Sequence, residues 1–539
     1  MAKERLYIFD TTLRDVAQTS GVDFSVEDKR AIAQSLDKLG VDYVEGGWPG
    51  ANPTDSSFFQ NLPELKRATF TAFGMTKRPG RSADNDPGLS EVVNADVGAV
   101  CLVGKAWDFH VDVALGIEHG ENVAMIGESV AHTIAKGREA LFDAEHFFDG
   151  YKANPAFALD CLKSALYAGA RWIVLCDTNG GALPHEISRI VGEVVEHIPG
   201  DRLGIHCHND TGNAIAGSLA AVQAGVRQIQ GSLNGLGERC GNADLVALIP
   251  ILKLKPGFAE NYEIGIDDEG LRHLTATSHL LDELLNRAPE RQAPFVGASA
   301  FAHKGGLHVS AVLKNPETYE HIDPSLVGNS RQVLVSNQAG RSNILARLTE
   351  AGIDFDPKNL KIIRLLDEVK QKEFDGYAYD GAEASFELMA RRTLGEVPVY
   401  FDVDAFRVMV ERRHNAEGEL ITVSEATVKL TVDGRQIMSV AEGNGPVNAL
   451  DNALRKDIGS FAKYIDDLEL VDFKVRILDG GTGAVTRVLI ESADGKGRRW
   501  FTVGYRPTSS MPHSWRCWNP LPTNCSRMAR QRLEGRGRH

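Results

Sequence analysis

The chain has 539 residues, 43% hydrophobic and 24% charged, which is the composition of a folded globular protein of roughly two to four domains. A formal net charge of −14 argues against binding to nucleic acid or to an anionic membrane surface, and no apolar run is long enough to span a membrane. The N-terminus shows no apolar signal segment, and the seven cysteines include no CxxC pair. We therefore expect a cytoplasmic protein with reduced cysteines.

The first 255 residues repeat one unit, in which a helical stretch ends at a glycine and an apolar strand follows. Gly40, Gly169 and Gly225 stand where a helix commonly ends in a left-handed backbone conformation, and Ser25 and Asp28 have the spacing of a capping box. The expected strands are LYIFD, VDYVEG, ATFTAFG, VGAVCLVG, EALFDAE, WIVLCD, RLGIHCH and VRQIQGS. Their alternation with helices predicts an α/β fold, a (β/α)8 TIM barrel.

Polar side chains follow the apolar part of these strands. In a TIM barrel this position is the C-terminal mouth, where active sites lie. Glu45 could equally cap or bridge the rim, so we leave it out of the predicted catalytic set. The strand-end residues are Asp15, Glu45, Glu145, Asp177, Thr178, His206, His208 and Asn242.

Three segments, DTTLRD, HCHND and NGLGERCGN, together predict a divalent-metal site. Because strand side chains alternate with period two, His206 and His208 face the same side. With the carboxylate of Asp15 and the amide oxygen of Asn242 they form a nitrogen and oxygen donor set that suits Mg, Mn, Zn or Co and argues against a thiolate site. A His pair alone would favour a structural role, but here the other donors accompany it.

The motifs TLRD, CDTNG, HCHNDTGNA, GLGERCGNADL, AFAHKGGLHVSAVLKNPETYEHIDP and GNGPVNALDNAL resemble those of acyl-CoA-condensing metalloenzymes with an Asp-Arg-Glu-type TIM barrel, the 2-isopropylmalate, homocitrate and citramalate synthases. The stretches EGGWPGANPTD, FDAEHFFDGYKANP and EFDGYAYDGAEASFELMARR are most similar to the citramalate-forming subgroup. The resemblance implies an acyltransferase of isoleucine biosynthesis that condenses acetyl-CoA with pyruvate. Formation of 2-isopropylmalate or homocitrate remains the alternative.

The resemblance also implies residue roles. Arg14 would face the developing alkoxide, Glu145 would be the active-site glutamate, and Thr178 would contact the substrate carboxylate. His308 and Tyr319, after the barrel, would take part in proton transfer over the active site, often that of a partner subunit. Without the resemblance, Arg14 could form a rim ion pair, Glu145 could be a solvated strand end, and His308 could be an ordinary residue at a helix start.

One position departs from the citramalate-forming pattern, which places bulky apolar residues beside the active-site glutamate. Here Asp143 stands two residues before Glu145, so its carboxylate is either turned outward or indicates another acceptor. Because methyl-sized differences discriminate by only about 1–3 kcal/mol, pyruvate, 2-oxobutyrate and 2-oxoisovalerate all stay open. A hydroxymethylglutaryl-CoA-type lyase would lack the C-terminal region, and a non-catalytic metabolite sensor would have lost a metal ligand, so we disfavour both.

The expected domains are the barrel in residues 1–255 with motifs reaching into 256–285, linker subdomains that contribute to the active site in 286–395, and an α+β regulatory or dimerisation domain in 396–505. Beyond Tyr400 the sequence alternates with period two, around the helical segment GPVNALDNALRKDI. The resemblance implies a homodimer that binds isoleucine or leucine as a feedback effector. A dimerisation module without a ligand is the alternative.

Residues 506–539 break this pattern with a run rich in arginine and without an apolar period. A basic tail could bind nucleic acid or anionic lipid. Alternatively, a one-base shift between Tyr505 and Ser526 restores the amphipathic sequence VSSNIIDASFLALLESIAYKLL, which indicates an out-of-frame tail caused by a nucleotide deletion near Gly504. Resequencing that codon tests this hypothesis, and an intact reading frame would contradict it.

Overall fold

A computed structural model describes residues 3–287, 289–333, 341–357, 359–374, 379, 382–397, 401–414, 418–432, 434–456, 465–477, 486–495 and 497–506. The chain forms two compact units, Met1–Phe301 with His321–Arg331 and Ala302–Glu320 with Gln332–His539. The finer division into four parts stays a prediction, and the tail beyond residue 506 lies outside the described residues.

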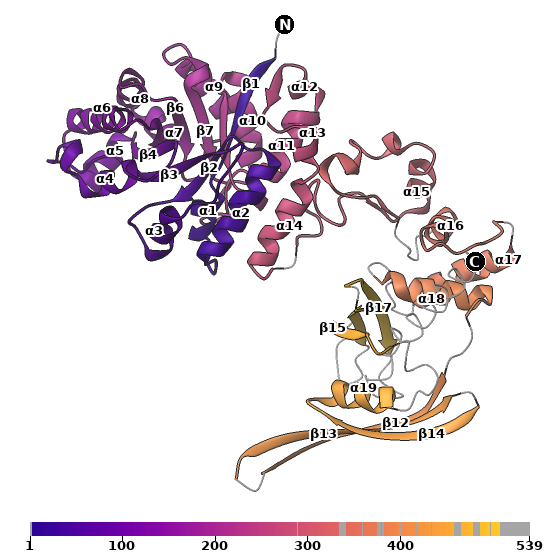
Figure 1. Cartoon of the computed structure of the whole chain (residues 1–539). Helices are drawn as coiled ribbons and strands as arrows, with labels where there is room; N and C mark the ends of the chain where they lie inside the picture. The colour runs from indigo at the N-terminus through magenta and orange to yellow at the C-terminus, as the bar shows by residue number, and fades with distance from the viewer. Residues whose placement is uncertain are drawn as a thin grey trace. The chain divides into compact units, whose positions relative to one another are not determined.

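The first unit is a closed parallel barrel (Figure 1). Strand β1 pairs with both β8 and β2, which closes the ring, so the predicted TIM barrel is confirmed. The short β9 pairs with the beginning of β1 and was not expected from the sequence. The strands are β1 (Glu4–Asp10), β2 (Tyr43–Gly47), β3 (Thr69–Met75), β4 (Ala99–Lys105), β5 (Glu139–Glu145), β6 (Trp172–Asp177), β7 (Leu203–Cys207), β8 (Gln228–Gly231) and β9 (Tyr262–Ile264).

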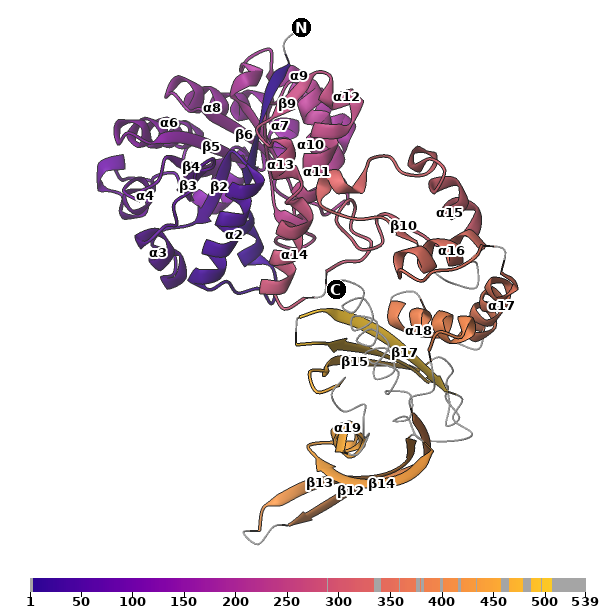
Figure 2. The same cartoon turned by 45° about the vertical axis from the view of Figure 1, so that its right-hand side comes forward.

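Helices surround the barrel strands, as both views show (Figure 1, Figure 2). The capping box predicted at Ser25 is present, because the Asp28 amide donates to Ser25 Oγ (3.1 Å) and the Ser25 amide donates to Asp28 Oδ2 (2.8 Å). Gly40 ends that helix with φ 99°. The helices are α1 (Thr12–Asp15), α2 (Val26–Leu39), α3 (Pro53–Gln60), α4 (Pro87–Val93), α5 (Asp108–His110), α6 (His119–Ala135), α7 (Phe147–Ala153), α8 (Pro155–Tyr167), α9 (Pro184–Val194), α10 (Ala214–Ala224), α11 (Leu245–Leu254), α12 (Pro256–Ala259), α13 (Asp268–Leu271) and α14 (Leu274–Leu284).

The barrel has two apolar clusters, one between strands and helices and one inside the ring. Along β5, Phe142 and Ala144 belong to the outer cluster, whereas Leu141 packs with Trp172 in the inner cluster. Since side chains alternate along a strand, Asp143 and Glu145 continue the inward face of Leu141. The same alternation turns His206 of β7 and both glutamines of β8 inward, and this places polar side chains inside the barrel.

The second unit contains two three-stranded antiparallel sheets, in the orders β12-β13-β14 and β15-β16-β17. The predicted helix between strands is α19, which packs on β13 and β14 through Leu450 and Leu454. No helix among the described residues is long and apolar enough to cross a membrane. The elements are β10 (Ala302–His303), α15 (Gly306–Val312), β11 (Gln332–Val333), α16 (Arg341–Glu350), α17 (Leu360–Phe374), α18 (Glu383–Leu394), β12 (Phe401–His414), β13 (Leu420–Val432), β14 (Arg435–Gly443), α19 (Pro446–Lys456), β15 (Glu469–Ile477), β16 (Thr486–Ala493) and β17 (Arg499–Arg506).

Candidate active site

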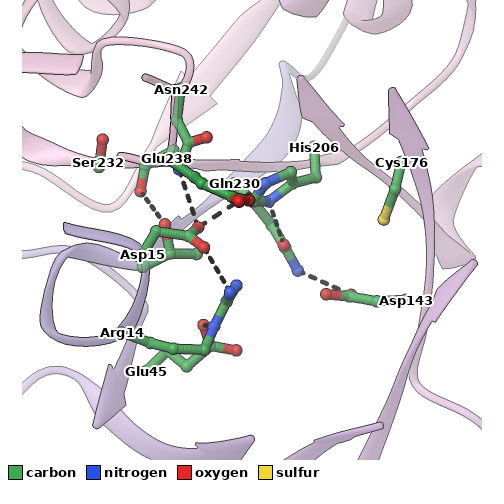
Figure 3. Close-up of polar contacts among 12 residues, drawn as sticks. Arg14, Asp15, Glu45, Asp143, Cys176, His206, Gln230, Ser232, Glu238 and Asn242 are labelled. Atoms are coloured by element: carbon green, nitrogen blue, oxygen red, sulfur yellow. Dashed lines mark hydrogen bonds and ion pairs between the residues drawn. The ribbon is translucent and has the colours of Figure 1, made fainter. Parts of the chain in front are cut away.

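The four predicted metal ligands follow the carboxyl ends of β1, β7 and β8, and Figure 3 shows three of them, Asp15, His206 and Asn242, close together. Asn242 Nδ2 donates a 2.9 Å hydrogen bond to Asp15 Oδ2, and His206 Nε2 lies 3.7 Å from the same oxygen. The rings of His206 and His208 are 5.1 Å apart between centroids. All four side chains are buried, so the barrel mouth holds a small, enclosed group of donors.

The backbone after β7 explains why Asn242 lies beside His208. The Asn209 amide donates to the Gly241 carbonyl (2.8 Å), the Ala243 amide donates to the Cys207 carbonyl (2.9 Å), and an antiparallel bridge joins His208 to Asn242. Gly241 has φ 88°, and a Cβ there would collide with the carbonyl of Gly235. The glycines of this loop therefore permit the close backbone approach that the sequence suggested.

Two buried polar atoms of this group fit a cation. Among the described residues, His208 Nδ1 and Asn242 Oδ1 have no hydrogen-bond partner, although buried polar atoms are normally paired. Burial lowers the pKa of His208 to about 3, so its imidazole is neutral near pH 7, the form that binds metals. In this structure, the carboxylate oxygens of Asp15 and the ring nitrogens of His206 and His208 do not offer three atoms that all lie within 4.8 Å of one another. Their chemistry nevertheless matches a divalent ion.

A chain of hydrogen bonds inside the barrel orients His206. Gln230 Nε2 donates to Asp143 Oδ1 (3.2 Å), and Gln230 Oε1 faces His206 Nδ1 at 2.9 Å (Figure 3). A carbonyl oxygen only accepts, so this contact places the proton on Nδ1 and leaves Nε2 free toward Asp15. Asp143 is therefore buried and faces inward, not outward, and burial raises its pKa.

Arg14 is held between two carboxylates. Its guanidinium pairs with Asp15 and Glu45 (Figure 3). It also lies 4.1 Å from the centroid of the Phe73 ring. Burial lowers the pKa of Arg14, but the carboxylates of Asp15 and Glu45 raise it more, so the pKa of Arg14 lies above its usual value. Burial also raises the pKa of Glu45, to about 8. Glu45, which we left out of the predicted set, is thus the residue that positions Arg14. The sequence did contain a sign of this position, because Glu45 follows Tyr43 by two residues on β2 and therefore shares its inward face.

Glu145 is partly exposed at the end of β5, and its carboxylate pairs with Lys105. It borders a cavity of about 200 Å³ whose wall also carries the cations Lys77, Arg78 and Lys105. Thr178, predicted to bind a substrate carboxylate, accepts a 2.8 Å hydrogen bond from the backbone amide of His146 through its Oγ1. The substrate roles of Glu145 and Thr178 stay predictions.

His308 and Tyr319 lie in the second unit, with their ring centroids 4.3 Å apart. The structure therefore brings these two predicted residues to each other, and 47% of Tyr319 is exposed. Their position over a barrel mouth stays a prediction. Among the described residues, Cys101 and three other cysteines are buried and unbridged, and Cys240 is exposed and unbridged. The reduced state stays a prediction.

Comparison with known proteins gives matches along the described chain. Residues 5–277 match the HMGL-like family, 295–373 match the homocitrate synthase post-HMGL domain-like family, and 380–509 match the LeuA allosteric (dimerisation) domain. The chain is 50% identical to an (R)-citramalate synthase of Aquifex aeolicus, covering 93% of this chain and 94% of that protein. It is also 50% identical to an (R)-citramalate synthase of Synechocystis, covering 93% of each, and 30% identical to a 2-isopropylmalate synthase of Methylorubrum populi, covering 92% and 91%. The chain therefore belongs to the (R)-citramalate synthase family of HMGL-like proteins.

Proposed function

We propose that this chain is an acyltransferase that condenses acetyl-CoA with pyruvate and water to give (R)-citramalate and CoA. The observation that carries this proposal is the buried group of Asp15, His206, His208 and Asn242, in which two potential metal-binding atoms have no hydrogen-bond partner in the described part of the chain. Five relatives called (R)-citramalate synthases are 42–50% identical to the chain. A putative (R)-citramalate synthase is 31% identical, and a probable 2-isopropylmalate synthase and a 2-isopropylmalate synthase are 33% and 30% identical. The five more similar relatives favour pyruvate as the acceptor. Asp143 faces inward, which is the orientation that would indicate another acceptor, and the acceptor series below decides between the two.

The reaction requires a proton to leave the thioester methyl group, a carbon–carbon bond to form at the acceptor carbonyl, and charge to develop on the carbonyl oxygen. When bound, a divalent cation supplies Lewis-acid stabilisation of that charge and a template for the 2-oxo acid. Asp15, His206, His208 and Asn242 would hold it. Arg14, oriented by its neighbouring carboxylates, would donate to the developing alkoxide.

The remaining residues would handle the acyl carrier and the protons. Lys77, Arg78 and Lys105 line one cavity with Glu145, and their positive charges suit the phosphates of CoA. Glu145, at the edge of this cavity, would lie near the thioester. His308 and Tyr319 would exchange protons with the methyl group or the alkoxide. Hydrolysis of the thioester would then release CoA and make the reaction irreversible.

The test measures thiol release from acetyl-CoA in the presence of Mn²⁺ or Mg²⁺. The acceptors are glyoxylate, pyruvate, 2-oxobutyrate, 2-oxoisovalerate and 2-oxoglutarate. We expect a preference for pyruvate that is abolished by EDTA and by His206→Ala, and retained in His197→Ala, which changes an exposed histidine outside the site. Preference for 2-oxoisovalerate would keep the mechanism and replace the acceptor, whereas no release with any acceptor would contradict the proposed function.

We propose further that the protein is a homodimer regulated by an end-product amino acid. Apolar side chains are exposed on β14, at Met438 and Val440, and on β15, at Phe473 and Val475, which is typical of an interface. The match to an allosteric dimerisation domain supports this role. Light scattering should give a dimer, and isoleucine, more than leucine, should inhibit thiol release. The cytoplasmic location stays a prediction.

A further inference from the structure

A second group of metal donors lies at the barrel mouth, apart from the predicted ligands. Among the described His, Cys, Asp and Glu side chains, one group has three donor atoms all within 4.8 Å of one another, and it consists of His110, Glu145 and His146. Glu145 ends β5, whereas His206 is on β7, two strands away in the sheet order. At about 4.8 Å between neighbouring strands, the backbones of β5 and β7 are about 10 Å apart.

The two imidazoles are fixed in place by their surroundings. The His110 ring stacks on Trp107, with centroids 5.1 Å apart, and lies 4.4 Å from the His146 ring. His146 adopts a left-handed backbone (φ 54°, ψ 36°), which costs a non-glycine residue about 1 kcal/mol and often marks a functional position. Its backbone amide donates to Thr178 Oγ1, and this hydrogen bond helps to hold the unusual conformation.

The hydrogen bonds of the histidines are those of metal ligands. His146 Nδ1 contacts Asp149 Oδ2 (3.1 Å), and Asn179 Nδ2 donates to the same oxygen (2.9 Å). A carboxylate behind one imidazole nitrogen orients the other nitrogen toward an ion, as in many metal sites. In addition, His110 Nδ1 is buried without a hydrogen-bond partner among the described residues. One imidazole of the group therefore has an unpaired ring nitrogen among the described residues, and the other imidazole is oriented by a carboxylate.

We propose that His110, Glu145 and His146 form a second divalent-cation site that takes a borderline ion such as Zn²⁺. Two imidazoles and one carboxylate favour Zn²⁺, Co²⁺ or Ni²⁺ over Mg²⁺, because the hard Mg²⁺ prefers oxygen donors. Lys105 pairs with Glu145, so a bound ion would replace this ammonium as the positive partner of the carboxylate. Lys105 thus competes with the ion.

The decisive experiment is a Zn²⁺ titration of the full chain against a chromophoric chelator. Its background has Cys240, Cys517 and Cys525 changed to serine, which removes the exposed thiol of the described residues and both thiols of the tail. We expect His110→Gln with His146→Asn to abolish binding of one ion, while an ion that depends on His206 and His208 remains. Asparagine tolerates the left-handed backbone, and circular dichroism verifies the fold. Unchanged stoichiometry and affinity in this double variant would overturn the proposal.

Two further variants separate coordination from a general effect of charge. Asp149→Asn should weaken this Zn²⁺ site about 10–100-fold, because it removes the carboxylate behind His146. Asp112→Asn is the matched control: Asp112 also contacts a histidine, His119, at 2.9 Å, but lies outside the group. Lys105→Met should tighten Zn²⁺ binding by removing the competing ammonium. Equal weakening by both aspartate variants would contradict the proposed geometry.

The consequence for activity rests on the proposed function. An ion at this site would withdraw Glu145 from catalysis, so Zn²⁺ added to the Mn²⁺-loaded protein should inhibit thiol release. In His110→Gln, half-inhibition should require about tenfold more Zn²⁺. Equal sensitivity would overturn this regulatory consequence. If thiol release failed with every acceptor, the proposed function would fail, and the Zn²⁺ stoichiometry would still decide the site.

Discussion

Replacing Gln230 by methionine tests whether the hydrogen-bond chain inside the barrel positions the metal ligand His206. The side chain is fully buried and connects His206 Nδ1 to Asp143 Oδ1. Methionine has a similar volume, so the substitution removes two hydrogen bonds without opening a large cavity. Loss of the partner behind a metal-ligating histidine lowers metal affinity about 10–100-fold, which corresponds to about 1.4–2.8 kcal/mol.

Stability should fall as well, because the substitution leaves a donor on His206 and an acceptor on Asp143 without their partner. An orphaned buried polar group costs about 1–3 kcal/mol, and we expect a total near 2 kcal/mol since Asp143 also interacts with Cys101. Mn²⁺ affinity is measured by competition with a chelator, and stability by the midpoint of urea unfolding without metal. The two readouts separate loss of ligand orientation from loss of fold.

Gln228 supplies a matched control on the same strand and the same face. It is also fully buried, but neither its Oε1 nor its Nε2 has a partner among the described residues. Gln228→Met should therefore leave Mn²⁺ affinity unchanged and raise stability slightly. Wild-type affinity in Gln230→Met, or an equal loss of affinity in Gln228→Met, would refute the positioning role of Gln230.

Three further substitutions test the electrostatics and backbone of the barrel. Burial raises the pKa of Asp10 from 3.8 to about 7, so between these pH values the folded chain keeps a proton that the unfolded chain releases. The free energy of unfolding of the wild type therefore falls as the pH rises from about 4 to 7. Asp10→Asn lacks this loss, and urea titrations should show it gaining stability relative to wild type over that interval. Lys29→Met leaves the buried carboxylate of Asp55 without its ion pair and should lower the free energy of unfolding by about 3 kcal/mol; a loss below about 1 kcal/mol would contradict this. Gly241→Ala should displace the loop at Gly235 and abolish tight Mn²⁺ binding, and normal binding would show that the loop tolerates a Cβ.

The strands and helix ends of the barrel could be predicted because their signals are local. Alternation along EALFDAE locates β5, and the residues at Ser25 and Gly40 begin and end α2. The three residues of β9 are too few to show a period, so that strand was missed. Some expectations concerned a single strand, such as the common face of His206 and His208. The alternation of side chains along a strand was enough to predict these.

Side-chain partners across the barrel could not be predicted in this way. Gln230 and Asp143 are 87 residues apart and come from β8 and β5, which are not neighbours in the sheet. Their contact crosses the interior of the ring, and a sequence shows only that both side chains face it. For the same reason Asp143 left two interpretations open, and Glu45 gave no sign that its partner would be Arg14.

The interior of the barrel is divided by chemistry. Phe9, Leu141 and Trp172 form part of an apolar inner cluster, whereas β8 contributes Gln228 and Gln230 to the same interior. Buried amides are costly unless they are paired, so a barrel selected for stability alone would carry apolar side chains at both positions. Gln230 is paired and orients a metal ligand, which accounts for its cost. Gln228 lacks a partner among the described residues, and the comparison of the two variants therefore measures what the polar interior contributes to metal binding and what it costs the fold.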